Sequence, residues 1–304
     1  MAMVASKSLA RVALWLLYVS ACASEHRPVP DQDGLVVLEL TSRPTAAPTA
    51  LPTPVTVAVD AGPADLESCV QKVRRDPFPA GAIDATGMYL AGIAAEERND
   101  TTGARKLFFD LIQAAPTSPF RPPSYFAFGE LFRAEARADP SKLQFARQVY
   151  DEVIKYPPDV NPLFEIAMLR KAELAAMAGE AQDALSILLK LAQAKSFGPC
   201  SDAVGRTIEV AIVPIYAAVG DPGKATMFFK RLGNAVGKDF GPVAALRLAR
   251  LYTDRNQRKE AQQTLRGLAS DGENLSPGAC ADAIALASEL GVSRPKDFEW
   301  RCKP

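Results

Sequence analysis

The side chains that most often carry catalysis are scarce in this chain. Its 304 residues include a single histidine, His26, and five cysteines. His26 lies in a segment rich in proline, threonine and alanine, so we expect no Ser-His-Asp triad, no Cys-His pair and no histidine-based metal site. The sequence also has neither a phosphate-binding Walker loop nor a dinucleotide glycine fingerprint. We therefore expect no cofactor.

Carboxylates are the remaining candidates for catalysis, and Glu96-Glu97 is the most conspicuous pair. Adjacent residues of an α-helix point in different directions, so this pair is typical of a solvated face and not of a matched acid and base. We predict that the chain is not an enzyme. A hydrolase that uses carboxylates alone, as glycosidases do, is the alternative.

The composition indicates a globular body without affinity for nucleic acid. Apolar residues make up 48% of the chain and charged residues 23%, enough for a real core. The net charge at pH 7 is zero, so no field attracts a polyanion, and nucleic acid is not an expected partner. The richness in alanine, leucine and arginine favours an all-α fold.

The amino terminus has the pattern of an export signal. Lys7 and Arg11 precede the apolar run 12–19, which ends in small residues at Ser20 and Ala21. The run is far shorter than the ~20 residues that span a bilayer, so we expect a cleaved signal and not a permanent membrane helix.

Residues Val19-Ser20-Ala21-Cys22 resemble the lipobox of bacterial lipoproteins. The resemblance implies that residues 1–21 are removed, that Cys22 is acylated, and that several acyl chains hold the protein stably on a membrane. Ala23, which follows the cysteine, then implies residence at the outer membrane, facing the periplasm. Ordinary cleavage after Ala23 is the alternative, because residues 21–23 also fit a small-x-small cleavage site.

The other cysteines, Cys69, Cys200, Cys280 and Cys302, form no CxxC pair, so neither zinc binding nor redox catalysis is indicated. An exported chain meets an oxidising compartment, where four cysteines allow three disulfide pairings. We favour Cys280 with Cys302, because intervening glycine and proline let the chain turn back. That bond would close a loop of about 22 residues and contribute about 3 kcal/mol. Buried reduced thiols are the alternative.

Residues 22–65 are predicted to be a flexible linker. Prolines fix φ and remove hydrogen-bond donors, so this Pro/Thr/Ala-rich stretch favours an extended path over a packed core. We expect it to hold the body, residues 66–304, away from the lipid surface.

The body contains a helical repeat. Five alanines are each followed, four and seven residues later, by large apolar side chains, which is one face of an α-helix. The sets are Ala104/Phe108/Leu111, Ala146/Tyr150/Val153, Ala184/Leu188/Leu191, Ala225/Phe229/Leu232 and Ala261/Leu265/Leu268. The alanines are 42, 38, 41 and 36 residues apart, which predicts a stack of five helical hairpins.

Two further positions support this register. Twelve residues before each alanine, where the paired helices must cross closely, the side chain is small in four of five cases: Gly92, Ala134, Ala172, Val213 and Ala249. Five residues before each alanine stands a turn former: Asn99, Ser141, Gly179, Gly220 and Asn256. Ser276-Pro277 then predicts the start of a terminal helix, which would cover the last apolar face of the stack.

In this order, a small residue, turn, alanine, aromatic residue and terminal proline resemble the tetratricopeptide repeat over residues 83–270. The chain lacks the tryptophan of that pattern, and its pitch exceeds the 34 residues of the family. The resemblance implies an all-α solenoid of antiparallel hairpins whose first helices line a groove for a peptide.

The resemblance also implies which residues line the groove, because the ninth position of each first helix faces the peptide. Carried onto this sequence, that position gives the groove residues Ile93, Glu135, Glu173 and Arg250, and Tyr89 belongs to the same face. An apolar end, an acidic middle and a basic end predict a partner segment that carries a lysine or arginine opposite the two glutamates. Ordinary solvated charges are the alternative.

These features together predict a lipid-anchored adaptor in the bacterial envelope that binds a protein or peptide partner. A component of a machinery that assembles outer-membrane β-barrels, a spacer without a specific partner, and a carboxylate hydrolase acting on envelope polysaccharide are the alternatives.

Overall fold

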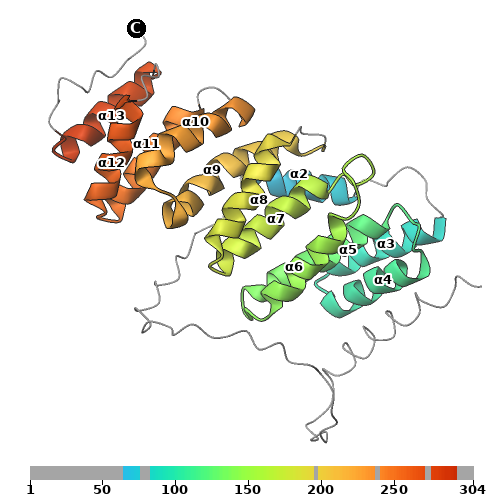
Figure 1. Ribbon diagram of the computed structural model, residues 1–304. Helices are drawn as coiled ribbons and strands as arrows, with labels where there is room; N and C mark the ends of the chain where they lie inside the picture. Colours follow the sequence, from blue (N-terminus) through green and yellow to red (C-terminus); the bar gives the residue numbers. More distant parts are fainter. Residues whose placement is uncertain (1–63, 76–82, 195–197, 237–239, 271–274, 293–304) are drawn as a thin grey trace, which may run out of the picture. The chain divides into compact units, whose positions relative to one another are not determined.

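The computed structural model describes residues 64–75, 83–194, 198–236, 240–270 and 275–292, all of which belong to one compact unit, Pro52–Pro304. The predicted signal and nearly all of the predicted linker lie outside the described residues. Within the described residues the chain forms twelve α-helices and no β-strand (Figure 1). The predicted all-α fold of stacked antiparallel hairpins is confirmed.

The hairpins follow one another along the chain. They are α3 (Ile83–Glu97) with α4 (Thr101–Ala114), α5 (Arg121–Ala136) with α6 (Lys142–Val153), α7 (Phe164–Met177) with α8 (Ala181–Gln193), α9 (Ser201–Val219) with α10 (Ala225–Val236), and α11 (Phe240–Asp254) with α12 (Arg258–Ser270). A 3₁₀ turn, η2 (Pro222–Lys224), precedes α10, and α13 (Pro277–Glu289) packs on α11 and α12.

The predicted register of the repeat is confirmed by burial. All five anchor alanines have no exposed surface, and every large apolar residue in their sets is buried. The turns follow from their residues as well. Asn99, Gly179 and Asn256 adopt the left-handed conformation, with φ of 61°, 80° and 59°, which Gly and Asn tolerate best.

The small-residue positions behave as expected with one exception. A Cβ atom on Gly92 would lie 2.5 Å from the Phe108 ring, so α3 and α4 can cross this closely only because glycine has no side chain. Ala172 and Ala249 are buried too, whereas Ala134 is exposed and takes no part in a crossing.

The fourth hairpin is built differently, as its Val213 at the small-residue position suggests. Its helices meet through aromatic rings, with the centroids of Tyr216 and Phe228 4.5 Å apart. The close backbone contact of α10 is instead with α11, where a side chain on Gly241 would lie 3.1 Å from the Cα of Lys230. α9 itself continues through Pro214.

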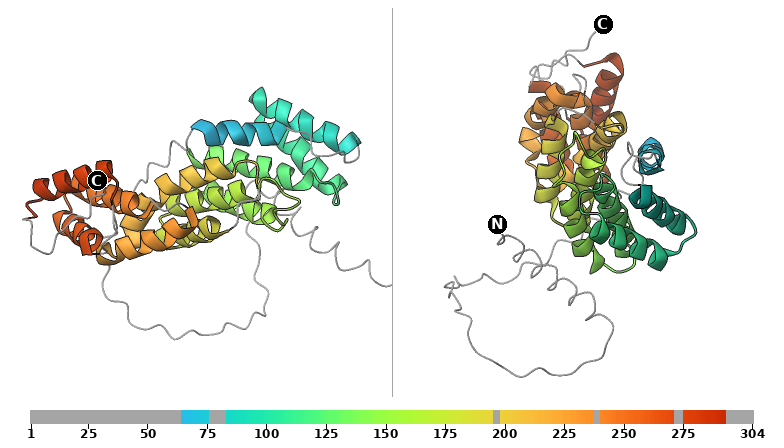
Figure 2. Two further views of the ribbon diagram at one scale, coloured as in Figure 1. Left: turned by 90° about the horizontal axis from the view of Figure 1, so that it is seen from above. Right: turned by 90° about the vertical axis from the view of Figure 1, so that its right-hand side faces the viewer.

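A helix that the sequence analysis did not anticipate, α2 (Ala64–Arg75), precedes the repeats. It lies alongside the stack of hairpins and outside their sequential order (Figure 2). Its apolar residues Leu66, Val70 and Val73 are buried in the same core cluster as α7 and α9, far along the chain. The position of α2 is central to the candidate site.

Candidate functional site

The apolar end of the predicted groove is buried. Tyr89 has no exposed surface, and its ring packs between those of Phe108 and Phe120, with centroids 5.9 and 5.3 Å away. Its hydroxyl donates a hydrogen bond of 3.0 Å to the carbonyl oxygen of Arg74 on α2. Ile93 is 7% exposed and belongs to the same cluster. The expectation that these two residues face a partner is wrong, since they fill the first hairpin and the contact with α2.

The acidic middle of the predicted row already has cationic partners. Glu135 is half-buried and pairs with Arg105, whose guanidinium lies 4.9 Å from the centroid of the Phe132 ring. Glu173 is 7% exposed, and its carboxylate lies 3.0 Å from Arg170. The predicted lysine or arginine of a partner would therefore find both carboxylates neutralised from within the chain.

The basic end, Arg250, is exposed and pairs with Glu289 of α13 at 2.7 Å. The structure thus does not bring the five predicted residues together as one open row. Three of them are buried, and the two at least partly open to solvent are engaged in ion pairs within the chain.

What occupies this side of the hairpins is α2, and we call the residues beneath it the α2-bound face. They come from the first helices of four successive hairpins: Glu96 on α3, Glu130 on α5, Arg170 and Glu173 on α7, and Cys200 and Arg206 at the start of α9.

Arg170 is the centre of the α2-bound face. Its side chain is 2% exposed, yet it pairs with three carboxylates on three different helices. Glu67 is contributed by α2, Glu130 lies 3.2 Å from the guanidinium and Glu173 lies 3.0 Å from it. A buried arginine is tolerated only when its donors are satisfied, and the fork of the guanidinium can serve several carboxylates at once.

Glu130 is held ionised by its neighbours. Burial alone would raise its pKa, but the charges of Arg170 and Arg133 and the hydrogen bonds from Arg133 and Tyr150 outweigh burial and lower the pKa to about 2. For Glu173, burial raises the pKa above its usual value against the opposing charge of Arg170. The two acids of one cluster are thus shifted in opposite directions.

The carboxyl-terminal end of α2 is fixed by charge as well. Arg74 is 3% exposed and makes a two-pronged contact with Glu96 of α3, at 3.1 and 2.5 Å. Arg75 binds the neighbouring Glu97 at 2.5 Å. Glu96-Glu97, considered above as an acid pair, therefore receives two arginines of α2 and is not arranged for acid-base catalysis.

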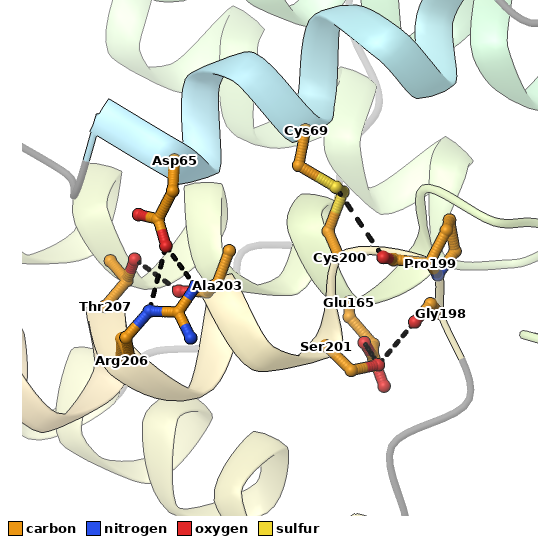
Figure 3. The surroundings of a disulfide bond; sticks show 10 residues. All are labelled: Asp65, Cys69, Glu165, Gly198, Pro199, Cys200, Ser201, Ala203, Arg206 and Thr207. Atoms are coloured by element: carbon orange, nitrogen blue, oxygen red, sulfur yellow. Dashed lines mark hydrogen bonds and ion pairs between the residues drawn. A yellow bond between two sulfur atoms is a disulfide. The ribbon is translucent and has the colours of Figure 1, made fainter.

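The middle of α2 is joined covalently to the stack. Cys69 forms a disulfide with Cys200, and their Cα atoms lie 5.8 Å apart (Figure 3). One helical turn before Cys69, the carboxylate of Asp65 accepts a hydrogen bond of 2.8 Å from the guanidinium of Arg206. The carbonyl oxygen of Pro199 lies 3.6 Å from the Cys69 sulfur, but a disulfide sulfur has no proton to donate.

This bond settles part of the cysteine prediction. Reduced thiols are excluded for Cys69 and Cys200, and their pairing is the one that the favoured bond between Cys280 and Cys302 requires. Cys280 is itself disulfide-bonded. Cys302 lies outside the described residues, so its pairing with Cys280 stays a prediction, as does the acylation of Cys22.

The sequence of α2 does carry a pattern typical of an amphipathic helix. Leu66, Val70 and Val73 have the same spacing of four and three residues as the repeat sets. Acidic residues in the first turn and basic residues in the last turn complement the helix dipole. The repeat does not predict this helix, because Leu66 replaces the alanine and the helix stands outside the repeat spacing.

The α2-bound face is therefore suited to holding a helix. It offers apolar contact in the middle and charges of both signs at defined places, and its disulfide couples the occupant to α9. Over the described ranges, no group of three or more His, Cys, Asp and Glu side chains is placed to hold a metal ion.

No protein-family model matches this sequence, and a comparison with characterised proteins finds no significant relative. Among the helices described, none has the length and apolar character needed to cross a membrane.

Proposed function

We propose that the chain is a lipid-anchored adaptor of tetratricopeptide type that faces the periplasm and binds an amphipathic helix of a protein partner. Acylation at Cys22 anchors it to the outer membrane, and the chain between Cys22 and α2 holds the helical body away from the lipid. The predicted linker, residues 22–65, is too long by two residues at its end, because Ala64 and Asp65 belong to α2. The body acts by binding and not by catalysis.

The observation that supports this proposal is the way in which α2 binds to the first helices of the hairpins. A helix of twelve residues lies on the first helices of the hairpins through three buried apolar side chains and through ion pairs at Glu67, Arg74 and Arg75. First helices that accept one amphipathic helix in this way have the shape and charge to accept another.

The side of α9 on which α2 lies extends beyond the amino-terminal end of α2. Val210 stands four residues after Arg206, on the same side of α9, and is 57% exposed. A large apolar side chain this exposed, next to an established helix contact, is a suitable place for a partner to continue.

A photo-crosslinking side chain at Val210 tests the proposal. Val160, in the segment between α6 and α7 and 55% exposed, is the matched control. We expect irradiation of envelopes to give a discrete protein adduct from position 210 and none from position 160. Adducts of equal yield at both positions, or none at either, would refute a partner at this surface.

The anchor is tested separately. Cys22→Ser is expected to move the protein from the membrane fraction to the soluble periplasmic fraction or to leave it unprocessed. A wild-type chain that is soluble and begins at Ser24 would contradict acylation.

A further inference from the structure

α2 resembles a separate helix bound to the stack of hairpins more than it resembles a helix that belongs to one of the hairpins. Its contacts reach residues far along the chain, 103 positions from Glu67 to Arg170 and 141 positions from Asp65 to Arg206. It does not share the repeat spacing, and its ion pairs go to α3, α7 and α9, which are first helices of hairpins.

The charges beneath α2 are arranged so that it can leave. Without α2, Arg170 loses Glu67 but keeps Glu130 and Glu173, so no buried arginine is left unpaired. Glu67 is 47% exposed, and Glu97 and Arg206 are near half-exposed, so water can replace their partners. Arg74, which α2 carries, would enter solvent together with the helix. Glu96, whose side chain is 25% exposed, and the hydroxyl of Tyr89 would exchange their contacts with Arg74 for water.

What holds α2 in place besides these contacts is the disulfide. A helix of twelve residues is too short to be stable by itself in water, so it must gain its order from the surface on which it lies. The covalent bond from Cys69 to Cys200 keeps the two surfaces together regardless of how weak the remaining contacts are.

We propose that α2 is a displaceable occupant of the α2-bound face, that the Cys69–Cys200 disulfide locks it there, and that a partner helix of the same pattern replaces it once the disulfide is reduced. The pattern is three apolar side chains spaced as Leu66, Val70 and Val73, with an acidic first turn and a basic last turn. This inference rests on the proposed function and adds to it the chemistry of the partner and the condition under which it binds.

The unlocking step is a thiol–disulfide exchange with a dithiol reductant. Cys200 is 3% exposed and Cys69 is half-buried, so the attacking thiolate reaches the Cys69 sulfur. A mixed disulfide forms on Cys69 and the Cys200 thiolate leaves. The second thiol of the reductant then attacks the mixed disulfide. Two protons and two electrons pass to Cys69 and Cys200, and the reductant becomes a disulfide.

A synthetic peptide of residues 64–75 with Cys69→Ser is the probe for the exchange of α2. Its matched control carries Leu66→Glu and Val70→Glu in addition. Binding of the labelled peptides is measured by fluorescence anisotropy with three forms of the purified chain: oxidised wild type, Cys69→Ser/Cys200→Ser, and the latter with Leu66→Glu/Val70→Glu, which disables its own α2.

We expect no binding to the oxidised wild type, weak binding to the unlocked chain, and binding at least about tenfold tighter when the tethered α2 no longer competes, because a tethered segment has a high effective concentration. The control peptide is expected to bind none of them. Equal binding to oxidised and unlocked chains would overturn the lock. No binding to a folded chain with a disabled α2 would overturn the exchange.

If circular dichroism shows that the chain with Leu66→Glu and Val70→Glu is unfolded, alkylation of Cys200 in the Cys69→Ser chain tests whether α2 can be displaced. The Cys200 thiol is expected to react with iodoacetamide in native buffer and to be slowed by the probe but not by the control peptide. Reaction only at the denaturant concentration that unfolds the chain would overturn the proposal.

The outcome is separable from that of the proposed function. If Val210 crosslinks a partner in equal yield in oxidised and reduced envelopes, the proposed adaptor function is supported and the proposed disulfide lock is refuted. If the peptide exchanges with α2 but no partner adduct forms, the displaceable α2 is supported and the proposed adaptor function is refuted.

Discussion

The interior of the hairpins and the α2-bound face are built on opposite principles. Inside the hairpins, alanines such as Ala184 and Ala225 meet large apolar side chains, all fully buried. At the contact with α2, the buried side chains include Arg74 of α2 itself and Arg170 and Glu173 of α7. The first region gains its stability from close packing, whereas the second holds buried charged side chains in ion pairs.

This difference indicates what each region does. Apolar packing is not directional, so it holds the hairpins together without selecting among partners. α2 brings a carboxylate to Arg170 and an arginine to Glu96. Under our proposal, the charged face selects its occupant and the apolar interior supports that face.

The largest expected effect comes from the centre of the charged face. Arg170→Met would leave Glu173 buried without its closest cation and Glu130 with Arg133 alone, and we expect a loss of about 3–5 kcal/mol in the free energy of unfolding. Arg206→Met, which breaks the exposed pair with Asp65, is the control and is expected to cost less than about 1 kcal/mol. Urea unfolding measures both, and equal losses would contradict the distinction.

The charged face should also give the protein a dependence on pH that the apolar interior does not have. The pKa of Glu130 is lowered from 4.5 to about 2, so its ionised form stabilises the fold above pH 4.5, and this contribution is lost as the pH falls toward 2. At 1.36 kcal/mol for each pKa unit, the contribution is about 3 kcal/mol.

Glu173, whose pKa is raised, acts in the opposite sense, because the fold favours its protonated form and gains stability as the pH falls through that pKa. Glu130→Gln is therefore expected to flatten or reverse the acid-induced loss of stability, as measured by urea unfolding at several pH values. A variant with the pH dependence of the wild type would show that Glu130 is not the group responsible.

A smaller effect is expected from overpacking the interior. Ala184→Leu would force a longer side chain into a contact with no free space and should cost about 1–3 kcal/mol. Ala134→Leu, at the exposed small-residue position, is the matched control and should leave the melting temperature unchanged. A similar loss in both variants would mean that the burial of the repeat register does not govern the interior.

The sequence could predict the interior because the interior is local. The spacing of Ala184, Leu188 and Leu191 within one helix, and the turn at Gly179 before it, are read from a short stretch of chain. The resemblance to the tetratricopeptide repeat implies that the first helices carry the binding side, and this stays a prediction. In the structure, α2 makes ion pairs with the first helices α3, α7 and α9.

The α2-bound face could not be predicted in this way, because it joins residues more than a hundred positions apart. No local pattern links Glu67 to Arg170, and the pairing of Cys69 with Cys200 was one of three that the cysteine count allowed. The position of Glu173 in the repeat predicts an open groove residue. It is buried because an arginine one turn away and the helix above it complete the cluster.

The most direct test of the account is amide hydrogen exchange measured in the oxidised and the reduced chain, with α2 compared to the interior helices α7 and α8. We predict that reduction of Cys69–Cys200 makes the amides of α2 exchange at least about tenfold faster while those of α7 and α8 stay protected, because a displaceable segment opens without global unfolding. Amides of α2 that remain as protected as those of α7 and α8 after reduction would contradict the claim that α2 is a locked occupant.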